Sequence, residues 1–376
     1  MTGENMGAGD MAAALLSESI SEDRSSAREG DLSQARGRTN IRRLLVSALL
    51  WLALTVLLVA GAMNAGALRQ YPTVSLRYET PVSGQAAYRA RQYAAKQTGE
   101  DVFWLTFWHQ TEARFSGGYN NANAECIFYS GDAALVWPAR YLYGAAPGVT
   151  DGTGCAVSSA LAWKIWGSAD VVGKTLEAGG EIRTVRGVFE GDDLLALLSV
   201  RDEDTGQSYT AVELSGGPAS PGRGDVESFI TASGLGTPDS ILMGTPVFFA
   251  EIMAILPLLI LACYGLALWI GRLRKRPAVQ KGLLLFAALM AFALLLPGLL
   301  EFLPGWMIPT RWSDFSFWSS LGQQISDNLR EYLTLTPGLR DVEYMILLLK
   351  QAGIAFLSAC CALSVCFRWH FIRKDA

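Results

Sequence analysis

The segment CAVSSALAWKIWGSADVVGKTLEAGGEIRTVRGVFEG, residues 155–191, carries the most informative pattern in this chain of 376 residues. From Ser158 to Trp166, apolar residues recur on roughly one face of a helix. Glycines at Gly173 and at 179–180 mark turns, and the run Ile182 to Phe189 has the alternation of a strand. The segment therefore predicts a helix, a turn and a strand within a folded domain.

The surrounding sequence mixes helix and strand patterns in the same way, which predicts an α+β domain over residues 69–246. About 175 residues are enough for such a domain to have its own core. The expected elements are a helix over 85–97, strands over 102–110 and 208–214, an apolar run over 126–137, a loop over 215–224 and a short helix over 226–233.

Four apolar runs have the length of about 20 residues that a membrane-spanning helix needs. They cover Leu44 to Leu68, Val247 to Ile270, Gly282 to Leu303 and Tyr344 to Phe367. The predicted fold class is thus a membrane protein with four transmembrane α-helices and an extracytoplasmic α+β domain between helices 1 and 2. The predicted divisions are a tail 1–41, helix 42–68, domain 69–246, helix 247–271, loop 272–281, helix 282–303, outer loop 304–342, helix 343–367 and tail 368–376.

Basic residues predict the orientation, because short cytoplasmic flanks retain Lys and Arg. One cluster precedes the first run, one follows the last, and a third joins the second and third runs. A single topology satisfies all three, with both termini in the cytoplasm of a cell membrane. The basic residues of the middle loop could contact either membrane lipid or a cytoplasmic ATPase; they are Arg272, Arg274, Lys275 and Arg276.

The first 41 residues contain too few apolar side chains to offset the entropy of ordering, so we expect a disordered tail. Residues 65–67, Ala-Gly-Ala, also have the form of a signal-peptidase site. The long region before the first run and the length of that run favour a retained membrane helix instead.

In the outer loop, an apolar stripe suggests a helix lying in the outer membrane interface or, equally, packed under the domain. Its residues recur at three- and four-residue steps; they are Phe315, Trp318, Leu321, Ile325, Leu329 and Tyr332.

The pattern in residues 155–191 resembles the signature of the extracytoplasmic core domain of MacB/FtsX-type ABC transporter permeases. The matching residues are Ser159, Leu161, Ala162, Trp166, Gly167, Asp170, Val172, Gly173, Lys174, Val185, Gly187, Val188 and Phe189. One helix, a large outer domain and then three helices is also the arrangement of that family. The resemblance implies a subunit that dimerises with itself or a related permease and relays the motion of a cytoplasmic ABC ATPase.

Two departures from the family pattern bear on this implication. The cytoplasmic segment of the family carries a coupling helix, whereas here only the sequence RLRKRPAVQK joins the second and third runs. The last outer loop is also longer than usual in the family. An uncoupled membrane scaffold or sensor, whose outer domain binds an envelope protein or peptide, is the alternative hypothesis.

Two side-chain pairs follow from the predicted topology. Cys126 and Cys155 are the only cysteines of the outer domain, and exported thiols favour a disulfide over two buried free thiols. Glu251 and Lys350 lie at similar depth in their helices, where a charge is costly, so we expect an ion pair. Alternatively, the Lys350 side chain extends outward along its helix to the interface.

Catalytic and cofactor motifs find little support in this sequence. The tripeptide 173–175, Gly-Lys-Thr, lacks the glycine spacing of a phosphate-binding loop, and no His, Cys or Glu cluster has metal-ligand spacing. We therefore expect no enzymatic activity, no cofactor and no metal. The acid-rich outer domain also makes nucleic acid an unlikely partner.

Overall fold

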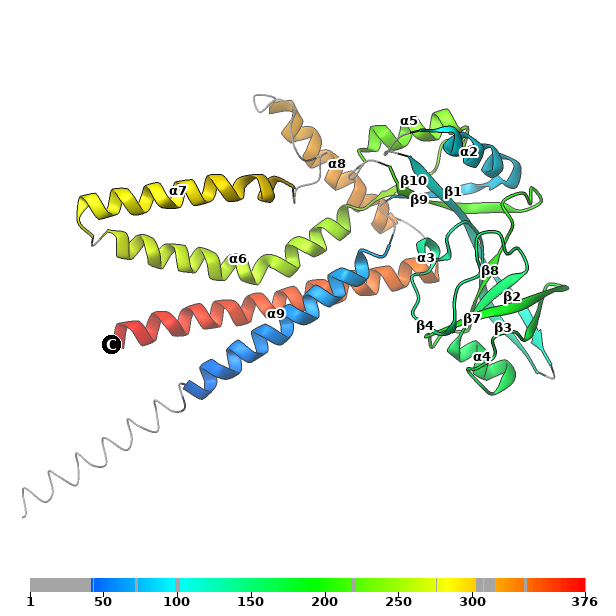
Figure 1. Ribbon diagram of the computed structural model, residues 1–376, viewed down its shortest axis with the longest axis horizontal. Coiled ribbons are helices and arrows are strands. Elements are labelled where there is room, and N and C mark those ends of the chain that lie inside the picture. Colours follow the sequence, from blue (N-terminus) through cyan, green and yellow to red (C-terminus); the bar gives the residue numbers. More distant parts are fainter. Residues whose placement is uncertain are drawn as a thin grey trace, which may run out of the picture.

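The computed structural model describes residues 42, 44–71, 74–98, 102–118, 120–217, 221–274, 276–301, 307, 315–334 and 337–375. The predicted disordered tail lies outside these residues. In Figure 1 a domain of strands and short helices occupies one end of the molecule, and long helices extend away from it.

Three helices are long and apolar enough to cross a membrane: Leu44–Leu68, α6 (Thr245–Leu273) and the Leu339–Trp369 part of α9 (Leu339–Asp375). The fourth predicted crossing falls on α7 (Ala278–Glu301), whose described apolar part, Ala278–Leu294, is shorter. Three of the four predicted crossings therefore have the length and composition of a membrane helix in the described part of the chain.

The domain is built on one mixed sheet of ten strands, in the order β10-β1-β9-β2-β3-β8-β5-β7-β4, with β6 pairing with β2 and β7. Most neighbours are antiparallel, but β3 with β8 and β5 with β7 are parallel. The strands are β1 Val74–Ser83, β2 Phe103–Gly117, β3 Asn120–Ser130, β4 Tyr141–Gly144, β5 Gly154–Ser158, β6 Thr175–Ala178, β7 Glu181–Phe189, β8 Leu195–Ser199, β9 Ser208–Gly216 and β10 Ser240–Met243.

The segment 155–191 folds as its pattern predicts. Helix α4 (Ser159–Trp166) begins after Ser158, whose side chain accepts a hydrogen bond from Leu161 N, and ends at Gly167 in the left-handed region with φ 66°. A serine cap and a glycine stop are the usual signals for such a short helix. Leu161 and Ile165 enter a core formed by α4 and the central strands.

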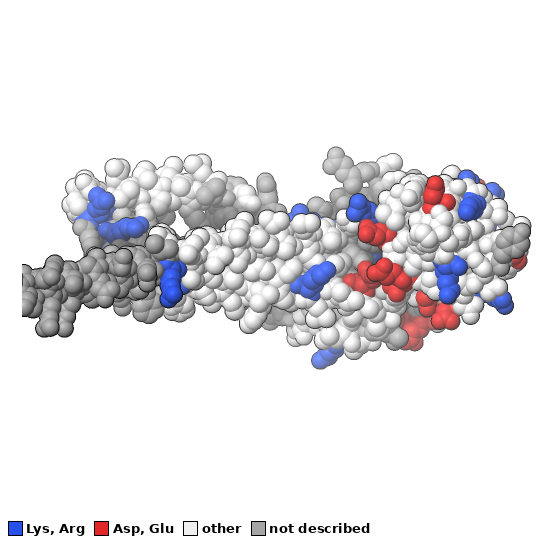
Figure 2. All heavy atoms as spheres, turned by 90° about the horizontal axis from the view of Figure 1, so that it is seen from below, with Lys and Arg blue, Asp and Glu red and all other residues white. Residues whose placement is uncertain are grey.

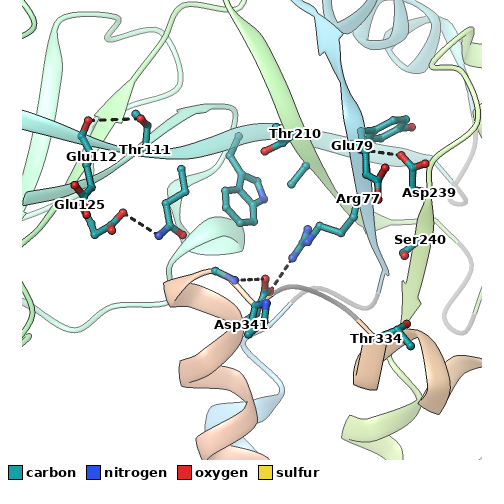
Figure 3. Close-up of a pocket in the computed structure, with 16 residues that line it drawn as sticks. Arg77, Glu79, Thr111, Glu112, Glu125, Thr210, Asp239, Ser240, Thr334 and Asp341 are labelled. Atoms are coloured by element: carbon teal, nitrogen blue, oxygen red, sulfur yellow. Dashed lines mark hydrogen bonds and ion pairs between the residues drawn. The ribbon is translucent and has the colours of Figure 1, made fainter.

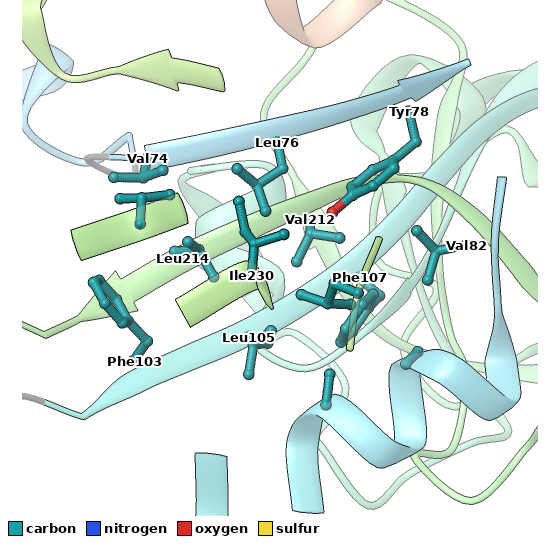
Figure 4. Close-up of a cluster of buried hydrophobic side chains, with 14 of the residues drawn as sticks. Val74, Leu76, Tyr78, Val82, Phe103, Leu105, Phe107, Val212, Leu214 and Ile230 are labelled. Carbon is teal, nitrogen blue, oxygen red and sulfur yellow. The ribbon is translucent and has the colours of Figure 1, made fainter. Parts of the chain in front are cut away.

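A second core lies under α2 (Gly84–Lys96) and α5 (Arg223–Ser233), on strands β1, β9 and β2. The alanines of α2 at 87, 90 and 94 form a narrow buried face that lets the helix approach the sheet. Figure 4 shows the large side chains that fill the space below, among them Phe103, Phe107 and Ile230. This core stabilises the part of the sheet to which the long helices are attached.

The chain enters and leaves the domain through two neighbouring strands, each of which is next to a long helix in the sequence. The helix Leu44–Leu68 precedes β1, and α6 begins at Thr245, directly after β10. Strands β1 and β10 are antiparallel neighbours in which Val74 lies opposite Met243. Pro246, in the first turn of α6, suits that position because it needs no hydrogen-bond partner for its nitrogen.

Candidate functional site

The N-terminal end of α9 is joined to the sheet by a buried group of charged side chains. Arg340, in the first turn of α9, lies 2.7 Å from a carboxylate oxygen of Glu213 in β9. Arg77 of β1 lies 3.1 Å from the same oxygen. These three side chains belong to segments far apart in the sequence, and we call them the junction.

Glu213 is fully buried, and its Oε1 is the centre of the junction. This oxygen also accepts hydrogen bonds from Trp108 Nε1 and Ser75 Oγ, each at 2.8 Å. A buried carboxylate is tolerated only when cations and donors replace the water it has lost. Its second oxygen, Oε2, has no hydrogen-bond partner among the described residues.

Arg77 extends the junction to a second carboxylate on α9. Its Nη2 lies 2.9 Å from Asp341 Oδ1. Burial by itself lowers the pKa of Arg77, but Glu213 and Asp341 outweigh this effect and raise the pKa above its usual value. Arg77 therefore remains a cation that holds β9 and α9 together.

Aromatic rings cover the two guanidinium groups of the junction. Arg77 and Arg340 lie over the Trp108 ring, at 4.9 and 5.4 Å from its centroid, and Arg340 also lies 5.6 Å from that of Tyr71. Cations over aromatic faces are favoured most where water is excluded. The junction is therefore a compact contact between the sheet and α9.

A cavity of about 550 Å³ opens beside the junction, between the sheet and the segment that leads into α9. In Figure 3, Asp341 at the start of α9 points toward Arg77 on the facing strand. Gln110 spans the same cavity, donating to Glu125 at 3.0 Å and accepting from Leu339 N at 3.2 Å. The start of α9 thus has backbone as well as side-chain contacts with the sheet.

Below the junction, polar side chains connect the three long helices. Asn64 Nδ2 donates to Leu347 O at 2.9 Å and to Gln351 Oε1 at 3.0 Å, and Gln351 Nε2 donates to Ala250 O at 3.2 Å. Gln351 is fully buried and Asn64 nearly so. We call this group the helix clamp, because it links the helix Leu44–Leu68, α6 and α9 at one level.

The predicted ion pair between Glu251 and Lys350 is not formed. Glu251 lies 2.5 Å from Arg69, at the end of the first long helix. Lys350 is exposed and has no ion pair among the described residues. The orientation of α9 about its axis explains this, because it turns the next residue, Gln351, toward α6 in the helix clamp.

The predicted disulfide is also absent, since Cys126 and Cys155 are both free and buried. They belong to β3 and β5, and β8 lies between these strands, with Cys126 opposite Ala196 and Cys155 opposite Leu198. Two strands separated by a third are about 10 Å apart. A disulfide requires Cα atoms within about 7 Å, so the strand order prevents it.

The predicted basic contact surface lies at the far end of the long helices. Helix α6 ends at Leu273 and α7 begins at Ala278, so the connection is short. Arg272, Arg274 and Arg276 are exposed there, whereas Lys275 lies outside the described residues.

Helix α8 (Phe315–Thr334) forms in the predicted outer loop, and its C-terminal half packs under the domain. Asn328 Nδ2 donates to Thr245 Oγ1 at 3.0 Å, and the Tyr332 hydroxyl donates to Met243 O at 2.8 Å. Packing under the domain, one of the two alternatives for this helix, is therefore observed for this half.

The described residues contain no cluster of three His, Cys, Asp or Glu side chains that could hold a metal ion. His109 is stacked on Phe128 with 4.9 Å between ring centroids, and burial lowers its pKa.

The junction residues were not identified from sequence. A possible signal was the isolated acid of the apolar run Ala211-Val212-Glu213-Leu214, since a carboxylate at a buried strand position requires a cationic partner. That signal indicates a partner but does not identify Arg77 or Arg340.

No family model and no curated protein matches this chain. Among solved structures, it is similar to the periplasmic region of MacB from Actinobacillus actinomycetemcomitans, with 13% identity, a TM-score of 0.39, and coverage of 47% of this chain and 92% of that one. It is also similar to the extracellular domain of the noncanonic ABC-type transporter YknZ from Gram-positive bacteria (12% identity, TM-score 0.31, 42% and 87% covered). A domain of a permease protein from Porphyromonas gingivalis has 14% identity, a TM-score of 0.32, and 43% and 82% covered.

Proposed function

We propose that this chain is a permease-type subunit of an ABC transporter or mechanotransmission complex. It is not itself an enzyme, and it relays ATPase-driven motion to its outer domain. The sequence pattern in residues 155–191 supports the family, and α4 and β7 have the form that this pattern predicts. The partners are a cytoplasmic ABC ATPase subunit and a second copy of this chain or a related permease.

The observation that carries the proposal is the junction between Arg340 and Glu213. A relay needs a firm connection between membrane helices and outer domain, because a loose tether absorbs displacement instead of passing it on. Here α9 is tied to β9 and β1 by buried ion pairs, and α6 continues directly from β10. A displacement of either helix along its axis would therefore exert a force directly on the sheet.

The proposed topology has four membrane helices, including α7, with both termini in the cytoplasm. From Glu251 to Arg272 the chain rises about 32 Å as a helix, close to the hydrocarbon thickness of about 30 Å. Figure 2 shows the corresponding distribution of charge, with a largely uncharged middle between the charged domain and the basic residues at the far end. Arg272, Arg274 and Arg276 would then meet the cytoplasm.

The experiment that tests coupling uses this basic loop. The triple variant Arg274→Gln, Lys275→Gln, Arg276→Gln leaves Arg272 and Lys281 to maintain topology. If the loop docks on an ATPase, the ATPase that co-purifies with the native chain should be absent from the purified variant. The two chains are compared at equal yield of membrane protein. Retention of the ATPase would mean that these residues contact lipid and that coupling uses another surface.

One observation favours a second candidate, an uncoupled scaffold or sensor that binds an envelope protein or peptide. The connection between α6 and α7 comprises only residues 274–277, which leaves no room for a coupling helix. Purification of the chain from its native membrane distinguishes the two candidates. An ATPase in the purified complex, with activity that responds to this chain, supports the relay, and an outer partner without an ATPase supports the scaffold.

A further inference from the structure

Helix α8 has two chemically different sides. Its polar side lines a cavity of about 570 Å³ together with Arg223 of α5, and an ion pair of 2.9 Å between Arg223 and Glu331 crosses this space. The other side is mainly apolar, with side chains at three- and four-residue steps; they are Phe317, Trp318, Leu321, Ile325 and Leu329. We call this second set the α8 stripe. Asn328 and Tyr332 lie on this side too, near its C-terminal end, and contact Thr245 and Met243.

The C-terminal end of α8 is fixed where the long helices meet the domain. Asn328 contacts Thr245, the first residue of α6, and the Tyr332 ring stacks on Tyr344 near the start of α9, with 6.0 Å between centroids. From this point α8 runs obliquely away from the domain and crosses the direction of α6 and α9 (Figure 1). At this level, helices of membrane-spanning length meet the domain.

Part of the α8 stripe remains exposed. Trp318 is 46% exposed and Leu329 43%, and the neighbouring Leu333 is 82% exposed. Trp318 also makes an edge-to-face contact with Phe317, at 5.4 Å between centroids. Aromatic side chains are enriched at the membrane–water boundary, where their apolar bodies meet the outer ends of the acyl chains.

The charge distribution of α8 identifies the kind of attraction. The charges on its described residues are Asp327, Arg330 and Glu331, all outside the stripe, with one more acid than base. Such a helix gains nothing from anionic headgroups, so only burial of apolar area can hold it at a membrane.

We infer that the α8 stripe is a lipid-binding surface that inserts into the outer leaflet at the boundary of headgroups and acyl chains. Because the other end of α8 is tied to β10 and α6, this insertion fixes the height and tilt of the outer domain above the membrane. The inference requires only that the long helices lie in a bilayer, and it is independent of an ATPase.

The test places single spin labels on the full chain in phosphatidylcholine nanodiscs. Trp318→Cys reports on the stripe, and Gln323→Cys is the matched control, because residue 323 lies about 140° around the helix from residue 318. The native cysteines are first replaced by alanine. Only variants that elute as a single folded species are labelled and measured. Ile325→Cys serves as a second stripe position if Trp318→Cys fails this criterion.

Insertion predicts that a stripe label collides several-fold more often with oxygen, which concentrates in lipid, than with a water-soluble nickel chelate. The control label should show the opposite preference, and added phosphatidylglycerol should change neither. Equal accessibility of both labels to the chelate would overturn the inference. So would exclusion of both reagents from the stripe, which indicates a covering protein, or a lipid preference that requires phosphatidylglycerol.

Discussion

Arg340 of α9 and Glu213 of β9 form a buried ion pair with 2.7 Å between Nη1 and Oε1. Strand β9 lies between β1 and β2, so the pair reaches the interior of the sheet and not its edge. Breaking the pair would leave charge in a region without water, which is far more costly than losing an ion pair at the surface.

Replacement of Glu213 by Gln should lower the free energy of unfolding by about 3–5 kcal/mol, because it leaves two buried arginines without their shared carboxylate. Thermal unfolding in detergent measures the loss. The matched control is Arg140→Gln, whose ion pair with Glu190 is exposed and should contribute almost nothing.

The same junction can be tested by a double-mutant cycle between Glu213→Gln and Arg340→Gln. Residues that interact directly should show a coupling energy of roughly 0.5–3 kcal/mol, so the double variant loses less than the sum of the single losses. Strict additivity would mean that the two residues do not interact.

The ion pair between Arg69 and Glu251 predicts which basic residue is coupled to Glu251. Combining Arg69→Gln with Glu251→Gln should restore part of what each single variant loses, whereas Lys350→Gln and Glu251→Gln should add. Arg69 is largely exposed, so the coupling will be small. Coupling of Glu251 to Lys350 instead would contradict the observed arrangement.

In the helix clamp, Gln351→Leu removes one of the two acceptors of Asn64 Nδ2 and the donor to Ala250 O. Hydrogen bonds between membrane helices average about 0.6 kcal/mol, so we expect a loss of roughly 1 kcal/mol and weaker association of the three helices. The control is Ser364→Ala in α9, whose hydroxyl donates only within its own helix, to Cys360 O. Equal melting temperatures of the two variants would show that the clamp does not hold the helices.

The thiols of Cys126 and Cys155 should be unreactive in the folded protein. Burial raises the pKa of Cys126 and of Cys155 to about 12. Alkylation of the folded protein should therefore stay slow from about pH 8 to 10. In the unfolded chain, by contrast, thiols of ordinary pKa ionise and react in this range. Mass spectrometry after denaturing alkylation should find both thiols modified and none linked. A linked peptide under non-reducing conditions would contradict the structure.

The same shifts predict a direction for stability. A thiol with a raised pKa in the folded state binds its proton more tightly there than in the unfolded chain. Its contribution is therefore complete below pH 9, its ordinary value, and is lost as the pH rises toward about 12. Cys126→Ala should weaken this loss in alkaline unfolding experiments, and an unchanged alkaline profile would argue against a buried thiol.

Much of the local structure was predictable, because the signals lie within a few residues of each other. Ser158 and Gly167 bound α4 as cap and stop, and the alternation in 182–189 marks β7. The apolar run of α6 was predicted almost to its ends, although the helix begins two residues earlier, with Pro246 in its first turn.

The pairings between distant segments could not be predicted in the same way, since they depend on strand order. Nothing near Cys126 or Cys155 in the sequence indicates that β8 will separate them. Glu251 was assigned to Lys350 because the two residues lie at similar depth, but depth does not fix the rotation of α9, in which Gln351 and not Lys350 faces α6. The junction residues come from β1, β9 and the start of α9, three segments that are far apart in the sequence and meet only in the folded protein.

The adjacency of Val74 and Met243 has a consequence for the architecture of the chain as a whole. Because the polypeptide enters and leaves the sheet at two hydrogen-bonded neighbours, the whole stretch 74–243 is an insertion whose two ends nearly coincide. Such a cassette can be excised and the gap closed by a few residues, or exchanged for another domain, with little change in the path of the flanking helices. Folded domains of different sequence could thus be carried on the same long helices, provided that each places a carboxylate against Arg340 as Glu213 does here.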